Sequence, residues 1–284
     1  MITLKNAHLG EYCTMRVGGP ADTVAFPETE EELVSLVALP GRKIVLGGGS
    51  NVIFPDSGYA GTVIFTTKLN CIGVNGTRVT AQAGAMLSAL ASAAADGSLA
   101  GLEFMFGIPG TVGGGVFMNA GAYGGQVSDR LESARVLSCA DGSVSVLDAG
   151  SLGFAYRDSL LQHKELILLS AVFALEKGDR REIKAAMSGN MKKRREKQPL
   201  EYPSCGSVFK RPDGYFAGAL IEECGLKGYA IGGACVSEKH AGFIVNRGGA
   251  TASDVIALIA HVRDAVYEKK GVLLECEVKI IENG

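Results

Sequence analysis

Hydrophobic and polar residues alternate along the chain in patterns that predict short strands separated by helices. The first clear pattern is a threonine at position 29, followed by three glutamates and an apolar run. Because threonine caps helix N-termini and acidic side chains suit the first turn, this pattern predicts a helix beginning at Thr29. Apolar runs at 43–46, 52–54 and 61–65 predict short strands, and alternation predicts another at 78–83.

The middle of the chain continues this mixture. Small residues at 86–95 predict a helix, whereas the glycine-dense stretch 101–125 has little regular pattern. An Asp-Gly turn signal at 140–143 predicts a hairpin across 134–147. The apolar run 165–174 predicts a further strand.

A charge-rich helix is predicted from about 179 to 196, and it is the best candidate for a domain boundary. Beyond it, 215–224 and 253–269 have the pattern of helices, and 243–246 and 275–281 that of strands. Together these patterns predict an α+β protein with two or three subdomains.

Composition and charge exclude several classes of protein. With 47% hydrophobic residues and a net charge of −2, the chain can bury a core. A pI near 6.1, the absence of tryptophan and an aromatic content of only 7% argue against nucleic-acid binding. The longest apolar run, 166–175, is too short to span a bilayer, and the first ten residues contain no secretory signal. We therefore expect a cytoplasmic protein with neither nucleic-acid nor membrane partners.

The cysteines and histidines predict neither a disulfide framework nor a metal site. The seven cysteines are scattered and odd in number, and none forms Cys-x-x-Cys. Such a set is typical of reduced thiols. The four histidines have no metal-ligand spacing. Any redox chemistry would therefore need an organic cofactor.

Glycine is the unusual component, since 39 of the 284 residues are glycine, roughly twice the ordinary ~7%. It concentrates in a loop at 47–51 and a second loop at 107–115, with 119–124 behind it. Glycine-rich backbone can form concave nests of N–H groups that bind phosphate oxygens. Tight turns between packed elements are the alternative. Two such loops in one chain favour phosphate binding.

The type of phosphate ligand is partly restricted by what the loops lack. Neither loop continues into Gly-Lys-Ser/Thr, which excludes a Walker nucleotide site. The 47–51 loop lacks the third glycine of the Rossmann fingerprint and leads into a strand instead of a long helix. Two separate nests suit the diphosphate of an extended cofactor such as FAD, although spacing alone leaves this open.

Four polar residues could carry chemistry, and each has an ordinary alternative. Arg157 could clamp a carboxylate or form a surface ion pair with the following aspartate. Ser207 could donate a proton or cap a turn; it is not in a Gly-x-Ser-x-Gly hydrolase motif. Glu277 shares one face of a predicted strand with two other charged residues, which could be a solvated face. Lys197 ends a basic cluster that could face an anionic substrate or only solvent.

With these residues in view, the chain from about 9 to 281 resembles the UDP-N-acetylenolpyruvoylglucosamine reductase family. Each motif is weak alone, but their order over nearly the full length is specific. The motifs are Leu46-Gly-Gly-Gly-Ser-Asn51, Gly101-Leu-Glu103, Gly107-Ile-Pro-Gly-Thr-Val-Gly-Gly114, Asn119-Ala-Gly-Ala-Tyr-Gly124, Tyr156-Arg-Asp-Ser159, Cys205-Gly-Ser-Val-Phe-Lys210, Ile231-Gly-Gly233 and Leu274-Glu-Cys-Glu-Val278.

The resemblance implies an FAD-binding domain of the p-cresol methylhydroxylase type at 1–178, with subdomains of about 1–55 and 56–178. A smaller α+β substrate-binding domain would follow at 179–284. No histidine lies between His8 and His163, so we expect FAD to be bound non-covalently. The residues that the resemblance implies for FAD are Gly47, Gly48, Gly49, Ser50, Asn51, Gly107, Pro109, Gly110, Thr111, Gly113, Gly114, Asn119, Gly121 and Ala122.

Catalytic and substrate-binding positions follow from the same resemblance. It implies catalysis by Arg157, Ser207 and Glu277, and substrate binding by Lys197, Tyr156, Lys210 and Arg211. The long form of the family inserts a tyrosine-bearing loop between the catalytic arginine and serine. Here those residues are only 50 positions apart (207 minus 157), so the chain resembles the short form.

The implied reaction is the NADPH-dependent reduction of UDP-N-acetylglucosamine enolpyruvate to UDP-N-acetylmuramate, in bacterial peptidoglycan synthesis. Hydride would pass through the flavin, and Arg157 would stabilise charge beside the substrate carboxylate. Glu277 would help if it is protonated or hydrogen-bonded there, and Ser207 would donate a proton. We expect a monomer that binds only small molecules and no metal. A related FAD oxidase with another substrate and a non-enzymatic nucleotide-sugar binding module are the alternatives.

Overall fold

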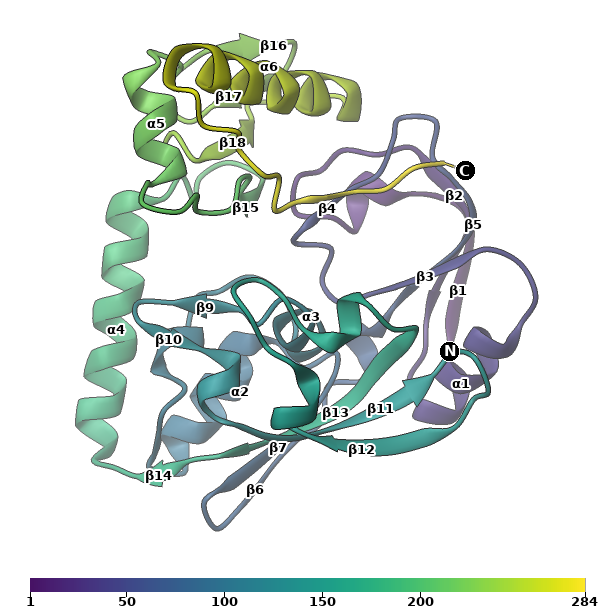
Figure 1. The fold of residues 1–284 in the computed structure, drawn as a ribbon. Helices are drawn as coiled ribbons and strands as arrows, with labels where there is room; N and C mark the ends of the chain where they lie inside the picture. The colour runs from purple at the N-terminus through teal and green to yellow at the C-terminus, as the bar shows by residue number, and fades with distance from the viewer. Residues whose placement is uncertain (284) are drawn as a thin grey trace. The chain divides into compact units, whose positions relative to one another are not determined.

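The computed structural model describes residues 1–283, which divide into two compact units (Figure 1). The units interleave along the chain, whereas the sequence predicts contiguous domains at 1–178 and 179–284. The first unit comprises Met1–Leu4, Thr23–Gly48 and Thr62–Lys193; the second comprises Lys5–Asp22, Gly49–Gly61 and the described residues from Arg194 onward.

Side-chain hydrogen bonds explain why two N-terminal segments belong to the second unit. The carboxylate of Asp56 accepts hydrogen bonds from the backbone N–H groups of Ala252 and Ser253, at 2.7 and 2.9 Å. The side-chain amide of Asn246 donates to the carbonyl of Met15 at 3.1 Å. These bonds join residues nearly 200 or more positions apart, which no local pattern could reveal.

The largest sheet lies in the first unit, and all of its neighbouring strands are antiparallel. The predicted hairpin is confirmed there, with Arg135 opposite Val146 and a turn at Gly142, whose φ is +72°. In spatial order the strands are β12 (Val144–Asp148), β11 (Leu131–Ser138), β13 (Leu166–Ala174), β7 (Arg78–Gln82) and β6 (Ile72–Asn75).

Two helices pack on this sheet, against β7 and β13 (Figure 1). They are α2 (Leu87–Asp96), close to the predicted 86–95, and α3 (Val112–Phe117). Their buried residues join one apolar core that includes Leu90 and Phe173. The helix α3 was not predicted, because three of its six residues are glycine.

A second sheet has the strand order β1-β2-β5-β3, and β3 and β5 are parallel. The helix α1 (Glu30–Ala38) begins as predicted, since the Thr29 hydroxyl accepts a hydrogen bond from the Glu32 N–H at 3.3 Å. Leu33 of this helix is fully buried in an apolar cluster with Ile64. The strands are β1 (Ile2–His8), β2 (Pro20–Phe26), β3 (Lys43–Leu46) and β5 (Tyr59–Phe65).

The chain passes from the first unit to the second within α4 (Arg180–Lys197), close to the predicted 179–196. In its first-unit part, Ile183 and Met187 join the core of that unit. The side-chain amide of Asn190 donates to the carbonyl of Glu103 at 3.3 Å. The helix is therefore anchored to the first unit through one face.

The second unit is built on an antiparallel four-stranded sheet, and α6 (Ala252–Lys270) packs on β16 and β17 (Figure 1). Thr251 and Asp254 form a capping box at the start of α6, and Gly271 ends it in the left-handed region. In spatial order the strands are β15 (Ser204–Ser207), β18 (Phe243–Asn246), β17 (Ala234–Val236) and β16 (Ala230–Ile231), with α5 (Ala217–Glu223) beside α6.

The C-terminal segment differs from the predicted strand at 275–281, because it changes partners midway. The Glu277 N–H donates to the carbonyl of Val208 at 2.7 Å, and the Lys210 N–H donates to the carbonyl of Glu275 at 2.8 Å. Only β19 (Lys279–Ile280) forms a regular strand, parallel to β4 (Val52–Ile53). The prediction of one continuous strand was therefore wrong, although the segment is extended.

Short elements complete the fold. The stretch 101–125, expected to lack regular structure, contains several of them as well as α3. The short strands are β8 (Leu99–Ala100), paired with β14 (Glu176–Lys177), and β9 (Gly121–Ala122), paired with β10 (Gly125–Gln126). The 3-10 helices are η1 (Leu9–Glu11), η2 (Thr66–Lys68), η3 (Glu103–Met105), η4 (Val127–Asp129), η5 (Gly150–Leu152) and η6 (Leu160–Gln162).

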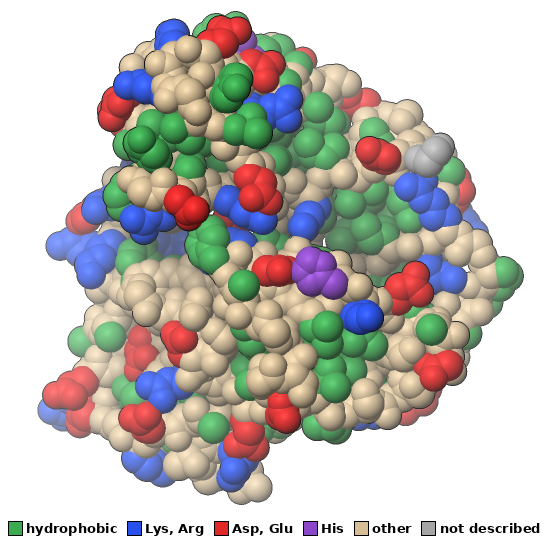
Figure 2. Space-filling model, viewed as in Figure 1, with side chains coloured by type: hydrophobic (Ala, Val, Ile, Leu, Met, Phe, Trp, Pro, Cys, Tyr) green, Lys and Arg blue, Asp and Glu red, His purple; other side chains and the backbone are tan. Residues whose placement is uncertain are grey.

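Figure 2 shows basic and acidic side chains interspersed over one face of the molecule, in keeping with the net charge of −2. Within residues 1–283, no helix is long and apolar enough to cross a membrane. All seven cysteines are free thiols.

Candidate active site

The first two glycines of the 47–51 loop follow β3 and lie against the second glycine loop within the first unit. A Cβ atom on Gly47 would lie 2.1 Å from the Thr111 hydroxyl oxygen, and one on Gly48 would lie 3.6 Å from the Cα atom of Gly110. Gly47 therefore has to be glycine if the loops are to keep this approach. The structure therefore places the two loops in contact, whereas the sequence predicts only that they bind the same ligand.

The second loop is held by backbone bonds to the start of α2 and to the segment before it. The carbonyl of Gly110 accepts from the Leu87 N–H at 3.1 Å, and the Gly113 N–H donates to the carbonyl of Ala83 at 2.7 Å. Gly107 and Gly110 have φ values of +87° and +119°, which L side chains rarely adopt. Pro109 and Gly114 are exposed, so the loop keeps an accessible edge.

Thr111 belongs to the second loop and lies where that loop contacts Gly47. Its residue is fully buried, and its hydroxyl has no hydrogen-bond partner within the described chain. A buried hydroxyl without a partner is unfavourable and calls for an explanation, such as a ligand. Among the described residues that the resemblance implies for FAD, only Thr111 has a buried side-chain polar atom without a hydrogen-bond partner.

Asn119, also implied for FAD, is engaged within the protein. Its side chain is 2% exposed and its φ is +42°. The side-chain amide donates to the carbonyl of Ala155 at 3.0 Å, and its oxygen accepts from the Ser128 N–H at 3.0 Å. Asn119 therefore ties the end of α3 to the turn that carries Arg157. Gly121 and Ala122 follow in β9.

The rest of the first loop lies in the second unit. Gly49 has a φ of +60°, and a Cβ atom there would lie 2.6 Å from the carbonyl oxygen of Tyr12. Ser50 and Asn51 follow, and the side-chain amide of Asn51 donates to the carbonyl of Glu277 at 3.2 Å. Asn51 therefore fixes the backbone at a predicted catalytic residue.

Arg157 lies in the first unit, in a tight turn closed by reciprocal backbone bonds between Ala155 and Asp158, both 3.2 Å. Its φ is +56°, in the left-handed region that glycine normally occupies at this point of a turn. The half-buried guanidinium donates to the carbonyl of Gly121 at 3.2 Å and lies 5.0 Å from the ring centre of Tyr156. The carboxylate of the aspartate that follows, Asp158, lies 2.9 Å from the side-chain nitrogen of His163.

Ser207 and Glu277 lie on neighbouring extended segments of the second unit. Ser207 ends β15 and is exposed, whereas Glu277 is half-buried. The bond from the Glu277 N–H to Val208 places the two residues one position out of register. Burial raises the pKa of the nearby Cys205 thiol to about 12, so that thiol is protonated and unreactive at neutral pH.

The predicted substrate-binding residues are mostly at the surface. Tyr156 is 51% exposed, and Lys197 is exposed in the last turn of α4. Lys210 pairs with Glu275 at 2.5 Å. Arg211 stacks on an aromatic ring of its own loop, with 4.0 Å between the guanidinium carbon and the ring centre of Phe216. The two basic residues next to β15 are therefore pre-oriented by internal contacts.

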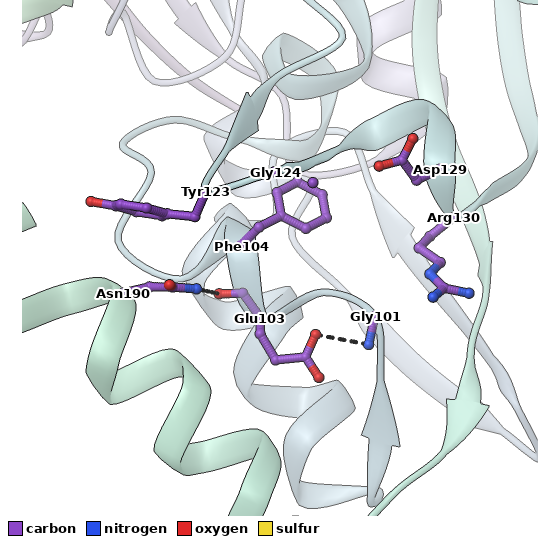
Figure 3. A pocket seen from close by; sticks show the side chains of 9 residues that line it. Gly101, Glu103, Phe104, Tyr123, Gly124, Asp129, Arg130 and Asn190 are labelled. Carbon is purple, nitrogen blue, oxygen red and sulfur yellow. Dashed lines mark hydrogen bonds between the residues drawn. The ribbon is translucent and has the colours of Figure 1, made fainter. Parts of the chain in front are cut away.

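A hollow of about 520 Å³ also lies in the first unit (Figure 3). Its polar groups are occupied internally: the Glu103 carboxylate accepts from the Gly101 N–H at 2.9 Å, and Arg130 pairs with Glu176 at 2.7 Å. Its lining includes residues of the Gly101-Leu-Glu and Asn119-Ala-Gly-Ala-Tyr-Gly124 motifs, but no sequence pattern predicted a hollow there. Its lining residues are Gly101, Glu103, Phe104, Tyr123, Gly124, Gly125, Asp129, Arg130 and Asn190.

Comparisons with known proteins give this geometry its context. The FAD binding domain model matches residues 21–148, and the model of the UDP-N-acetylenolpyruvoylglucosamine reductase C-terminal domain matches residues 198–281. A UDP-N-acetylenolpyruvoylglucosamine reductase from Caldicellulosiruptor bescii is 48% identical over 286 residues, covering 98% of this chain and 90% of its own. The chain belongs to the UDP-N-acetylenolpyruvoylglucosamine reductase family.

Other members of the reductase family agree. The protein of that name from Latilactobacillus sakei is 50% identical over 280 residues, covering 97% of this chain and 92% of its own. The crystal structure of the reductase from Thermus caldophilus matches with a TM-score of 0.86 and 37% identity, covering 97% and 98% of the two chains. The family resemblance and the predicted fold class, an FAD-binding domain followed by a C-terminal α+β domain, are therefore confirmed.

Proposed function

We propose that the chain reduces UDP-N-acetylglucosamine enolpyruvate to UDP-N-acetylmuramate, a step in peptidoglycan precursor synthesis, with FAD as cofactor and NADPH as hydride donor. The observation that carries the proposal is the near full-length similarity to reductases of this name, in a chain whose FAD binding domain contains both glycine loops. The alternative of a non-enzymatic binding module has no comparable support.

The residues of the glycine loops fit the diphosphate of FAD. The close approach at Gly47, the accessible edge at Gly114 and the orphaned hydroxyl of Thr111 suit a ligand rich in anionic oxygens. Bound FAD would supply hydride chemistry that no side chain offers. The chain would hold it without a covalent bond, through the backbone of residues 47–51 and 107–114 and through Gly121 and Ala122.

Arg157 is proposed to bind the substrate carboxylate. A guanidinium can form two parallel hydrogen bonds with a carboxylate. When hydride reaches the methylene carbon, negative charge develops at the carbon beside that carboxylate, and a fixed cation stabilises it. The half-buried position of Arg157 and its bond to Gly121 are consistent with a guanidinium that does not need to reorganise during the reaction.

Ser207 is proposed to deliver the proton that completes the reduction, and Glu277 to assist at the same carbon. Ser207 is exposed, so a substrate can reach its hydroxyl. Glu277 is fixed through its backbone by the bonds to Val208 and Asn51. Tyr156, Lys197, Lys210 and Arg211 are proposed to contact the sugar nucleotide, whose diphosphate attracts cationic groups.

We also propose that the enzyme works as a monomer in the cytoplasm. Its seven free thiols suit a reducing compartment. Size-exclusion chromatography with light scattering would report a mass near 29.5 kDa for the monomer.

The decisive experiment measures NADPH oxidation by the yellow holoenzyme with and without UDP-N-acetylglucosamine enolpyruvate. We expect oxidation to depend on this substrate, and Ser207→Ala to leave flavin reduction by NADPH intact while slowing reoxidation by the substrate by about 10²–10⁴-fold. Fast NADPH oxidation without the substrate would point to a related FAD oxidase. Normal reoxidation in Ser207→Ala would remove that residue from the mechanism.

A further inference from the structure

Arg157 has a backbone conformation that arginine rarely adopts, although its guanidinium suits the proposed binding of a carboxylate. A φ of +56° places the Cβ atom of a non-glycine residue too close to its own carbonyl. Such a conformation persists only where neighbouring groups hold it. Arg157 therefore depends on the neighbouring groups that hold this turn.

Gln162, five positions further on in η6, contacts the Arg157 backbone directly. Its side-chain nitrogen donates to the carbonyl of Arg157 at 2.8 Å and to the carbonyl of Phe117 at 3.0 Å. A side-chain amide carries two N–H groups, so each can serve one of the two carbonyls. Phe117 is the last residue of α3, whose final carbonyls lack partners within the helix.

Gln162 therefore bridges two parts of the first unit. One is the end of the helix that follows the second glycine loop, and the other is the strained backbone of the proposed carboxylate-binding arginine. The Ser159 hydroxyl donates to the same Phe117 carbonyl at 2.8 Å. Asn119 supports the turn at Ala155, and the guanidinium itself donates to Gly121.

We propose that Gln162 is a positioning residue for Arg157. Its amide holds the left-handed backbone and so fixes the direction in which the guanidinium projects. The inference rests on the proposed function for the role of Arg157, but the bond between the two residues can be tested without any activity. The alternative is that Gln162 only caps α3.

The first test is a stability cycle on purified protein. Gln162→Met keeps the length of the side chain but removes both donors. We expect it to lower the Tm by about 2–4 °C in the parent and by about half as much in the Arg157→Gly background. Glycine adopts φ +56° readily, so it has less need of the holding bond, while the loss at Phe117 is the same in both backgrounds. Equal Tm shifts in the two backgrounds would overturn the proposal.

The second test uses the holoenzyme and its two half-reactions. We expect Gln162→Met to slow flavin reoxidation by UDP-N-acetylglucosamine enolpyruvate by about 10–100-fold, and to change flavin reduction by NADPH less than twofold. In the Arg157→Ala background the same change should have less than a twofold further effect, because its effect passes through Arg157. An equal factor in both backgrounds would assign Gln162 a purely structural role.

Two controls separate the possible failures. Ser159→Ala removes the other donor to the Phe117 carbonyl, so a role confined to capping α3 predicts the same slowing as in Gln162→Met. We expect less than a threefold change in turnover instead. If the parent enzyme reduces its flavin but the enolpyruvyl substrate never reoxidises it, the proposed function fails, and the stability cycle still decides the role of Gln162.

Discussion

The second glycine loop and the Arg157 turn both place backbone in the left-handed region, but by opposite means. The loop uses residues without side chains, with φ values of +87° at Gly107 and +119° at Gly110. The turn uses an arginine at +56° and surrounds it with hydrogen bonds from Gln162 and Asn119. Glycine suffices where the backbone itself is to meet a ligand. Where a side chain must meet the ligand, the strain is retained and the neighbouring residues are arranged to hold it.

Removing the arginine side chain should give the largest effect. We expect Arg157→Ala to lower kcat by about 10²–10³-fold, roughly 2.7–4 kcal/mol of transition-state stabilisation, while the FAD content is unchanged. Steady-state kinetics with absorbance spectra of the purified protein measure both. A change below threefold would mean that the strained turn serves structure alone, and the contrast with the glycine loop would disappear.

A side chain in the loop should act on stability instead. We expect Gly110→Ala to destabilise the apoprotein by about 1–3 kcal/mol, because alanine does not tolerate a φ of +119°. Urea unfolding measures this change. Gly114→Ala is the matched control, since it lies in α3, its φ is not in the left-handed region, and a Cβ atom there would lie 4.0 Å from Thr111. Equal losses in both variants would contradict the conformational explanation.

The Thr111 hydroxyl tests whether the second glycine loop binds a ligand. Thr111→Val replaces an orphaned buried hydroxyl by a methyl group of similar shape, so the apoprotein should gain about 1 kcal/mol. The affinity for FAD should fall if the hydroxyl serves the cofactor. Thermal unfolding without FAD and fluorescence titration with FAD separate the two effects. An apoprotein that is less stable than the parent would show that the hydroxyl already has a partner.

The smallest expected effect compares glycine with alanine at the strained turn. Arg157→Gly and Arg157→Ala lose the same guanidinium, but only glycine adopts φ +56° without steric cost. We expect the glycine variant to be more stable by roughly 0.5–1 kcal/mol, after its greater entropy in the unfolded chain is subtracted. Urea unfolding of the two variants under identical conditions gives the difference. Greater stability of the alanine variant would mean that the turn relaxes once the arginine is gone.

Local signals in the sequence predicted much of the fold. The Thr29 cap, the Asp-Gly hairpin at 140–143 and the strand Phe243–Asn246 are determined by neighbours in the chain, and the structure confirms them. The end of the chain was harder, because 275–281 changes partner between Val208 and the strand at 52–53. Its residues keep one alternating pattern throughout, and this pattern carries no information about which segment lies beside them.

The candidate site shows the same division. The glycine loops and Arg157 stand out as motifs, but the contact between Gly47 and Thr111 joins residues far apart in the sequence. Gln162 lies only five positions from Arg157, yet nothing in its residue type suggests a bond to a strained carbonyl. The functional motifs could therefore be predicted from the sequence. The residues that hold these motifs in place could be identified only from the three-dimensional structure.

The interleaving of the two units has a consequence for how the protein is made. Asp56 supplies the carboxylate that binds the first N–H groups of α6, and Asn246 reaches back to Met15. During synthesis, residues 5–22 and 49–61 leave the ribosome long before α6 and the strands with which they pack. They can pair with each other early, as in the bond from the Gly19 N–H to the carbonyl of Pro55, but their C-terminal partners come only after the intervening residues have been made. Such long-range contacts slow folding and leave early segments exposed to aggregation, so the second unit is expected to be the last to form, only after nearly the whole chain has emerged.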